Sequence, residues 1–340
     1  MTQPKTILSK FALGRGPFKT LDPFLFCVYH RDDYPKGQTN MGPTPAQLRN
    51  RDIGSDFSYT DGWSMYHGDT VPGFPEHPHR GFETITVTRL GIVDHSDSLG
   101  CTARYGEGDV QWMTAGEGIQ HSEMFPLLKM DAPNPLDLFQ IWLNLPKAKK
   151  MCKPHFTMFW KECLPVVEVS SGAKVRVIAG LFEGSSALPS PPDSWAADPA
   201  HDVAVWVLEL AAGSSVHLPP ATRDTCNRCL YTVSGGSVNV NDEELPQRTG
   251  AVVNARVTID VRARETSVVL VLQGVPIGEP VVQHGPFVMN TQQEIMEAFS
   301  DFRRTGFGSW PWPSSDHTHS RETSRHARHP NGKVEAPPTS

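Results

Sequence analysis

The chain has 340 residues, a formal net charge of −6 and a pI of about 6.2. It carries no long basic stretch, so direct contact with nucleic acid is not expected. No window approaches the roughly 18 apolar residues of a membrane span, and no continuous apolar segment follows the first charges as in a secretory signal. The length fits one large domain or two of ordinary size.

Short strands separated by turns are predicted through most of the chain, because 28 glycines and 30 prolines disfavour long helices. The alternation in Thr84–Thr88 places Ile85 and Val87 on one face of a strand and the threonines on the other. In the first half, alternating or apolar runs predict the strands Pro23–Tyr29, Thr84–Leu90, Asp109–Met113 and Leu136–Leu145.

A polar, glycine-rich and aperiodic segment, residues 36–72, separates the first two of these strands. We interpret it as a long insertion loop. The second half of the chain repeats the pattern of short strands, which predicts two similar β domains joined within residues 146–172. Its predicted strands are Val175–Ala179, Val203–Leu210, Cys229–Val233, Ser237–Val240, Val257–Val261 and Ser267–Leu272.

One helix is predicted, over residues 291–304. Thr291 and Glu294 form a capping-box pair, and Gly306 follows as a stop signal. Residues 313–340 contain no aromatic residue and few apolar ones, so we expect a disordered tail. The pair His317 and His319 within this tail lacks a surrounding strand pattern, and we interpret both as solvated.

Histidines and a glutamate with strand spacing form the most informative pattern. His77 and His79 stand two residues apart before a strand, so an extended chain points both side chains to one side. His121 and Glu123 alternate in the same way some 40 residues later. Imidazole is a good ligand for iron, copper, zinc and nickel. Two facing strands of a barrel would therefore bring three imidazoles and one carboxylate to one metal ion.

The sequence motifs in and around these segments resemble those of the pirin family, within the cupin superfamily. The resemblance covers residues 5–312. It rests on LDPFLF (Leu21–Phe26), GFPEHPHRGFET (Gly73–Thr84), GDVQWMTAGEGIQHSEM (Gly108–Met124), QHGPFVMNT (Gln283–Thr291) and FGSWPW (Phe307–Trp312).

The resemblance implies a bicupin fold, in which two antiparallel β-barrels of the jelly-roll type are followed by the short helix. The implied division is an N-terminal metal-binding barrel over residues 1–150, a second barrel with the helix over residues 151–312, and the tail. It also implies a mononuclear Fe(II) site formed by three histidines and one glutamate. These positions match His77, His79, His121 and Glu123.

The same ligands suit Cu, Ni, Co, Mn or Zn, so the sequence leaves the identity of the resident metal open. Glu83 occupies the place of the usual cupin glutamate, and the resemblance assigns it a supporting role. The second barrel has no comparable histidine set. Its Cys226 and Cys229 form one CxxC pair, which lacks the partners of a zinc site.

Two classes of function follow from the resemblance. The first is a quercetin 2,3-dioxygenase, which opens flavonols oxidatively. Glu123 would then accept the substrate proton when it is displaced from the metal. An apolar pocket would be formed by Phe74, Trp112, Met113 and Trp142, for which barrel core is the alternative interpretation.

The second class is a non-enzymatic, redox-sensitive iron protein that binds transcription factors or metabolic enzymes. We expect a monomer, because both barrels lie in one chain. The expected location is the cytoplasm, with the nucleus as the alternative, since no clear basic targeting run is present. The six cysteines fit reduced thiols.

Overall fold

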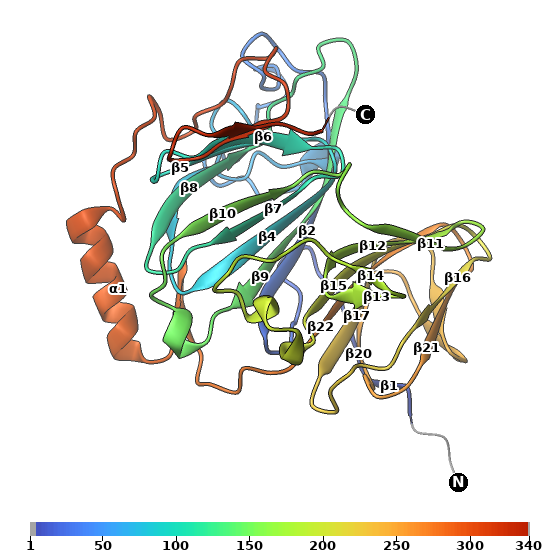
Figure 1. The fold of residues 1–340 in the computed structure, drawn as a ribbon. Coiled ribbons are helices and arrows are strands. Elements are labelled where there is room, and N and C mark those ends of the chain that lie inside the picture. Colours follow the sequence, from blue (N-terminus) through green and yellow to red (C-terminus); the bar gives the residue numbers. More distant parts are fainter. Residues whose placement is uncertain (1–4, 339–340) are drawn as a thin grey trace. The chain divides into compact units, whose positions relative to one another are not determined.

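The computed structural model describes residues 5–338, which form two compact units built mainly from β strands (Figure 1). The predicted all-β class with a short C-terminal helix is confirmed. No helix among the described residues is both long and apolar enough to cross a membrane. The first unit comprises residues 30–140, 147–162 and 279–338, and the second unit comprises residues 5–29, 141–146 and 163–278.

Two sheets form the first unit, with strand orders β10-β7-β4-β9-β2 and β26-β25-β6-β5-β8-β3. The strands of the five-stranded sheet are β2 (Phe24–Tyr34), β4 (Phe82–Leu90), β7 (Val110–Thr114), β9 (Asn134–Asn144) and β10 (His155–Phe159). Residues 24–29 of β2 and residues 141–144 of β9 belong to the second unit. Those of the six-stranded sheet are β3 (Gly73–His79), β5 (Ile92–Asp97), β6 (Thr102–Gly106), β8 (Ile119–Met124), β25 (His326–Arg328) and β26 (Val334–Glu335).

The alternation predicted for β4 is present, and both of its faces are buried. Ile85 and Val87 pack on one side, while Thr86 on the other side donates a hydrogen bond to Glu123 of β8. A strand that is covered on both faces positions its side chains firmly. The threonine side of β4 thus faces the inside of the first unit, toward the six-stranded sheet.

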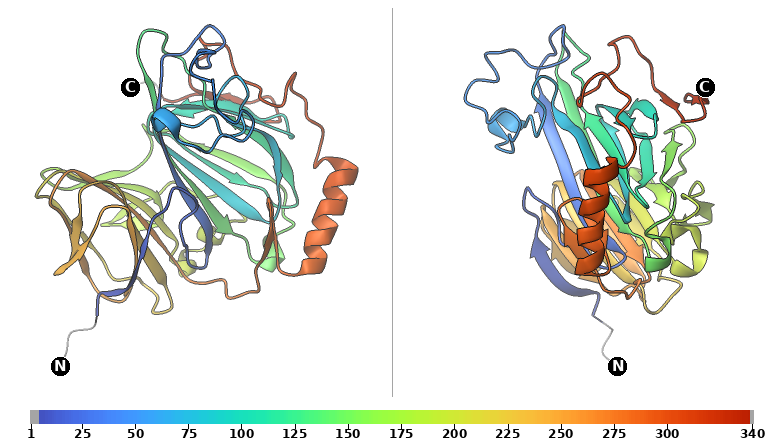
Figure 2. Two further views of the ribbon diagram at one scale, coloured as in Figure 1. Left: turned by 180° about the vertical axis from the view of Figure 1, so that it is seen from behind. Right: turned by 90° about the vertical axis from the view of Figure 1, so that its left-hand side faces the viewer.

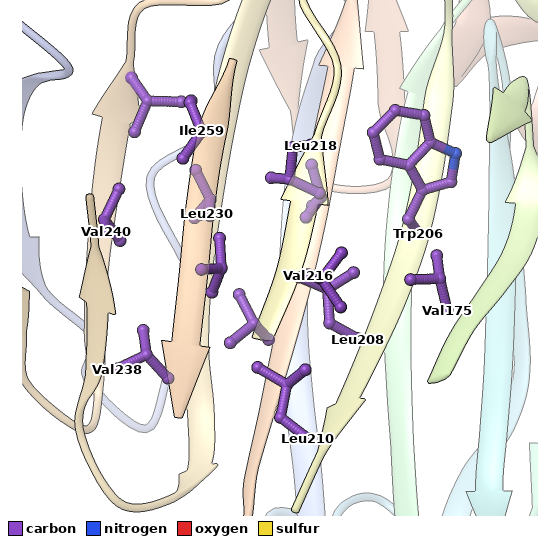
Figure 3. Close-up of a cluster of buried hydrophobic side chains, with 14 of the residues drawn as sticks. Val175, Trp206, Leu208, Leu210, Val216, Leu218, Leu230, Val238, Val240 and Ile259 are labelled. Carbon is purple, nitrogen blue, oxygen red and sulfur yellow. The ribbon is translucent and has the colours of Figure 1, made fainter. Parts of the chain in front are cut away.

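The second unit has a seven-stranded sheet, β1-β20-β17-β22-β15-β12-β11, and a four-stranded sheet, β16-β21-β18-β19. Its seven strands are β1 (Ile7–Ala12), β11 (Val166–Ser170), β12 (Ala173–Ala179), β15 (Ala204–Leu210), β17 (Asn227–Gly235), β20 (Thr249–Val253) and β22 (Ser267–Gly274). Its four are β16 (Ser215–Leu218), β18 (Val238–Val240), β19 (Glu243–Leu245) and β21 (Ile259–Ala263). Aliphatic side chains and Trp206 fill the space between the sheets (Figure 3).

Short elements connect these strands. In the second unit, β13 (Leu181–Phe182) pairs with β14 (Ser185–Ser186), and in the first unit β23 (Val282–His284) pairs with β24 (Phe287–Met289). The 3₁₀ turns are η1 (Thr60–Gly62), η2 (Lys147–Lys149), η3 (Trp195–Ala197) and η4 (Pro199–His201).

Helix α1 (Gln292–Thr305) agrees with the predicted helix to within one residue at each end. The capping box of Thr291 and Glu294 is present, and Gly306 ends the helix in the left-handed conformation that a glycine adopts without strain. The helix runs along the first unit (Figure 2), where Asp301 pairs with Arg80 at 3.0 Å.

Residues 36–72 lack regular strands, as predicted, but their side chains reach the core. Arg51 lies over the Trp63 ring at 3.4 Å and pairs with the buried Asp56 at 2.8 Å. Tyr66 donates a hydrogen bond to Asp32 and also contacts Nδ1 of His30. This loop is therefore folded around a buried network of polar side chains. Its polar composition gave no indication of this burial.

The prediction of a disordered tail is wrong for residues 313–338, which have a defined conformation. Strand β25 pairs with β6, and β26 pairs with β25 (Figure 1). The composition misled because hydrogen bonds and ion pairs, rather than apolar burial, hold this segment. His317 and His319 are likewise half-buried against Ser96 and Thr102.

The domain division also differs from the predicted boundary at residue 150. Residues 5–29 belong with the second unit, because β1 completes its larger sheet beside β20. The C-terminal helix and the segment after it belong with the first unit. The chain thus enters each unit more than once, which strand composition alone does not reveal.

The carboxyl group of Asp32 provides a test of the loop network. Burial raises its pKa to about 7, although hydrogen bonds from Tyr66 and Ser64 act in the opposite direction. The folded state therefore binds this proton more tightly than the unfolded chain. The resulting stability is complete below about pH 4 and is lost as the pH rises through about 7.

We expect Asp32→Asn to remove this pH dependence. Relative to the wild type, the variant should gain about 2–3 kcal/mol of unfolding free energy between about pH 5 and about pH 8. Urea unfolding of the metal-free proteins at both pH values measures the difference. A difference that does not change with pH would contradict the assigned pKa.

Candidate metal centre

Three imidazole rings converge where strands β3 and β8 pair. His77 lies directly opposite His121 in the antiparallel register, and a bulge between Phe74 and His77 adjusts the strand just before the first histidine. The ring centroids lie 4.4 Å apart for His77 and His121, and 4.9 Å apart for His79 and His121. One ligand atom from each of the three rings lies within 4.8 Å of the others.

The outer nitrogens of two rings are held by backbone carbonyl groups. Nδ1 of His77 lies 2.8 Å from the Pro75 oxygen, and Nδ1 of His79 lies 3.4 Å from the Pro286 oxygen. A carbonyl oxygen only accepts, so each Nδ1 carries the proton and Nε2 carries the lone pair. This tautomer is the one that a metal ligand needs.

His121 provides the test of whether a metal fits. Its side chain is fully buried, and neither ring nitrogen has a hydrogen-bond partner among the described residues. Buried polar atoms without partners are costly and uncommon. Burial lowers the pKa of His121 well below its usual value, and the neighbouring His77 and His79 lower it further. The neutral His121 ring therefore has a nitrogen without a partner beside the rings of His77 and His79. This arrangement suits the binding of a cation.

Glu123 lies beside the three rings but outside their cluster. Its Oε2 is 4.0 Å from Nε2 of His121, and its carboxylate accepts hydrogen bonds from Thr86 and Gln140, each at 3.0 Å. Burial raises its pKa, against the influence of His95, Thr86 and Gln140. A nearby divalent cation would favour the ionised form. The structure thus brings the three predicted histidines together and places the predicted fourth ligand next to them.

Several supporting residues were missed by the sequence analysis. His95 lies opposite Glu123 in the pairing of β5 and β8, with its ring 5.5 Å from His121 and its Nε2 3.2 Å from Asp97. The alternation of His95 and Asp97 along one strand was the available signal. Pro286 gave none, because its carbonyl reaches His79 from 207 positions away.

Glu83 lies apart from the cluster. It is fully buried on β4, and its Oε1 accepts a hydrogen bond of 2.6 Å from Thr114. Threonine and glutamate stand directly opposite each other in the pairing of β4 and β7. This contact gives Glu83 a position within the five-stranded sheet, which is compatible with the supporting role expected for it.

The four predicted pocket residues occupy different surroundings. Phe74 is half-buried, with its ring 6.3 Å from that of His77. Met113 pairs with Thr84, on the side of β4 that faces inward. Trp112 alternates to the opposite side, where it pairs with Ile85. Trp142 belongs to the second unit, where its ring stacks on Phe26.

Comparisons with known proteins agree with this architecture. The family model described as Pirin matches residues 38–143, and the one described as Pirin C-terminal cupin domain matches residues 205–308. A pirin-like protein of Caulobacter vibrioides is 38% identical over 239 residues, which cover 70% of this chain and 82% of that protein. The chain belongs to the pirin family.

Other pirin-family relatives extend the comparison. The chain is 35% identical to rat pirin over 261 residues, which cover 73% of this chain and 83% of that protein. A crystal structure of quercetin 2,3-dioxygenase from Acinetobacter baumannii superimposes with a TM-score of 0.72 at 28% identity, covering 90% of this chain and 99% of that one. The bicupin prediction is thereby confirmed. Relatives of this pirin-family chain imply a site for a divalent metal ion, and the histidine triad offers three ligand atoms for one.

Replacement of His121 tests the triad. We expect His121→Ala to reduce bound metal from about one ion per chain to nearly none, because the remaining ligands no longer surround the ion. Elemental analysis of protein that was loaded and then desalted gives the ratio. His217→Ala is the matched control, since His217 is exposed in the second unit. Equal metal content in the two variants would contradict the assignment.

Proposed function

We propose that this chain binds Fe(II) through His77, His79, His121 and Glu123 and cleaves flavonols as a quercetin 2,3-dioxygenase. The observation that carries the proposal is the buried His121, whose two unpartnered nitrogens lie beside two further neutral imidazoles. Three imidazoles and a carboxylate suit iron, although Cu, Ni, Co, Mn and Zn are compatible with the same donors. The similarity to the Acinetobacter enzyme supports the choice of substrate class.

The neutral state of the histidines favours metal binding. Burial lowers the pKa of His77 to about 4 and that of His79 well below its ordinary value. The rings therefore need no deprotonation before they act as ligands near neutral pH. Bound iron would supply Lewis acidity toward a substrate hydroxyl and the redox chemistry that O₂ requires.

Glu123 is the residue that we assign to proton transfer. Its carboxylate is held by Thr86 and Gln140, which fix its orientation without neutralising its charge. Once displaced from the metal, this carboxylate would accept the proton of a flavonol hydroxyl within hydrogen-bond reach. The flavonolate then reacts with O₂, and ring opening consumes O₂ and releases CO in equal amounts.

An aromatic cluster next to the metal ligands would receive the planar substrate. The Phe74 ring stacks on Tyr66 at 5.0 Å and 26°, and His67 and His30 lie edge-on to it at 5.8 and 5.9 Å. Phe74 lies on β3, whereas the other three rings come from other parts of the chain. Two of these three, Tyr66 and His67, belong to the loop of residues 36–72. Phe57 of the same loop is 54% exposed and contacts Tyr66. We assign this loop to substrate access.

The direct test is flavonol turnover. Protein loaded anaerobically with Fe(II) is mixed with quercetin and air, and the loss of flavonol absorbance and the release of CO are followed. We expect turnover by the wild type. Glu123→Gln should lower kcat by about 10²- to 10⁴-fold, because a general base is lost. Rates are expressed per bound iron, so that a loss of metal is separated from a loss of the base.

Absence of turnover across several flavonols, with full iron loading, would overturn the enzymatic proposal. The iron-binding regulator that acts through protein partners would then be the favoured function, and iron-dependent binding of those partners would be its test.

The exposed end of the loop supplies a separate prediction. Phe57→Ala should raise KM for quercetin several-fold, about 3- to 10-fold, through the loss of one aromatic contact. Metal content should stay unchanged, because Phe57 touches none of the ligands. Leu181→Ala, at another exposed apolar residue, in the second unit, is the control. Unchanged KM would exclude the loop from substrate access.

A further inference from the structure

The outer face of strands β5 and β6 carries an ordered cluster of polar and charged side chains. Asp94 stands opposite Arg104 and Ser96 stands opposite Thr102 in the register of these strands. Alternation puts all four on the side away from His95, whose ring faces the metal ligands. Asp94 and Arg104 are almost completely buried, which is unusual for charges on the outside of a sheet. The segment 313–335 is what covers them.

Arg104 is the centre of this surface. Its Nε and Nη2 donate to the two oxygens of Asp94, each at 2.7 Å. The remaining N–H groups donate to backbone carbonyls of the segment: Nη1 to Ser320 at 2.7 Å, Thr323 at 3.0 Å and Arg321 at 3.3 Å, and Nη2 to His319 at 3.2 Å. Asp94 in turn accepts a bond of 2.9 Å from the backbone N–H of His319. The ion pair of Arg104 and Asp94 thus binds the backbone of the segment.

We propose that this face is a peptide-binding site whose ligand is the chain's own segment 313–335, and that its occupation slows exchange of the metal. The ligand class is an extended peptide with a tight turn, recognised mainly through its backbone. Strand addition to the edge of β6 is part of the recognition, since β25 pairs there from His326 to Arg328.

Side chains add register to the backbone contacts. Nδ1 of His317 lies 2.8 Å from the Ser96 hydroxyl, and Nε2 of His319 lies 3.0 Å from the Thr102 hydroxyl. Farther along, Arg325 forms an ion pair of 2.8 Å with Asp109. These contacts fix which residues lie over which strand positions. An unrelated peptide would lack them.

The character of the surface makes the segment detachable. Ala327 is the only fully buried apolar side chain among residues 313–338. Departure of the segment would expose Asp94, Ser96, Thr102 and Arg104, which water solvates well. Its apolar contacts are those of Ala327 with the core and of His329 with Phe156, so the loss of hydrophobic free energy is limited to this part.

Two contacts connect the bound segment to the metal ligands. The backbone N–H of Glu76, which directly precedes His77, donates 2.8 Å to the Ser315 oxygen. Trp312, which directly precedes the segment, donates from its indole to the Asp97 backbone oxygen at 2.8 Å, and its ring is held by stacking on His317 of the segment. Asp97 holds His95, next to His121. Occupation therefore restrains both β3 and β5.

The experiment uses a chain that ends after Trp312 and a fluorescent synthetic peptide of residues 313–338. Fluorescence anisotropy measures binding of the peptide to the metal-free truncated protein, after circular dichroism and size-exclusion chromatography have shown that it is folded. We expect saturable binding at one peptide per chain. Binding to the full-length protein and binding of a scrambled peptide should both be much weaker.

Metal exchange is measured in the same proteins. Transfer of Ni(II), which avoids oxidation, to an excess of a chromogenic chelator should be at least about fivefold faster for the truncated protein, as expected for coupling between two sites. Saturating peptide should restore the full-length rate. The metal-exchange measurement depends on the proposed metal site. Binding of the peptide requires neither metal nor turnover, so failure of the enzymatic proposal leaves the peptide-binding result unaffected.

A variant of the intact chain gives an independent reading. Arg104→Lys keeps the charge but loses the planar set of donors that reaches Asp94 and the carbonyls together. We expect faster amide hydrogen exchange over residues 319–328 than in the wild type, with α1 unchanged. Arg303→Lys, at an exposed position of α1, is the matched control.

Three results would overturn the proposal. The first is a truncated chain that does not fold, because the segment would then be an integral part of the core. The second is a folded truncated chain that does not bind the peptide. The third is an equal rate of metal release with and without the segment, which would remove the connection to the metal centre.

Discussion

Burial of three imidazoles beside one another is the constraint on which the first unit depends. The rings of His77, His79 and His121 hold their ligand nitrogens within 4.8 Å, in surroundings that keep all three neutral. Protonation of any one would place a cation in a poorly solvated site, and the unpartnered nitrogens of His121 would stay unsatisfied without an ion. A divalent metal would satisfy one of these two nitrogens, and the buried carboxylate of Glu123 would offset part of the charge of the ion.

The surrounding structure can be understood as support for this arrangement. Antiparallel pairing of β3 with β8 sets His77 opposite His121, and pairing of β8 with β5 adds His95 behind Glu123. A backbone carbonyl of β3 itself and one from a distant hairpin orient the outer nitrogens of His77 and His79. The loop of residues 36–72 contributes the aromatic rings around Phe74, and the C-terminal segment ties down the strands from their outer side.

Much of this could be predicted from the sequence, for identifiable reasons. Strand alternation and the spacing of His77, His79, His121 and Glu123 are local signals, so the β class and the proximity of these four residues followed from them. The capping box and Gly306 located α1 equally well. The order of the C-terminal segment was not predictable from composition, because Arg104 holds it through backbone carbonyls, which any sequence provides. The contact of Pro286 with His79, and the fact that the chain enters each unit more than once, depend on long-range contacts. A single sequence does not show such contacts.

The coordination of the bound metal is the central claim, and X-ray absorption spectroscopy of the iron-loaded protein measures it most directly. The account predicts a shell of nitrogen and oxygen atoms at about 2.0–2.2 Å, with the multiple-scattering signature of three imidazoles and with no sulfur. The spectrum of His121→Ala, at whatever occupancy it reaches, should show fewer imidazoles. A wild-type spectrum with one imidazole or none, or with a thiolate ligand, would contradict the account.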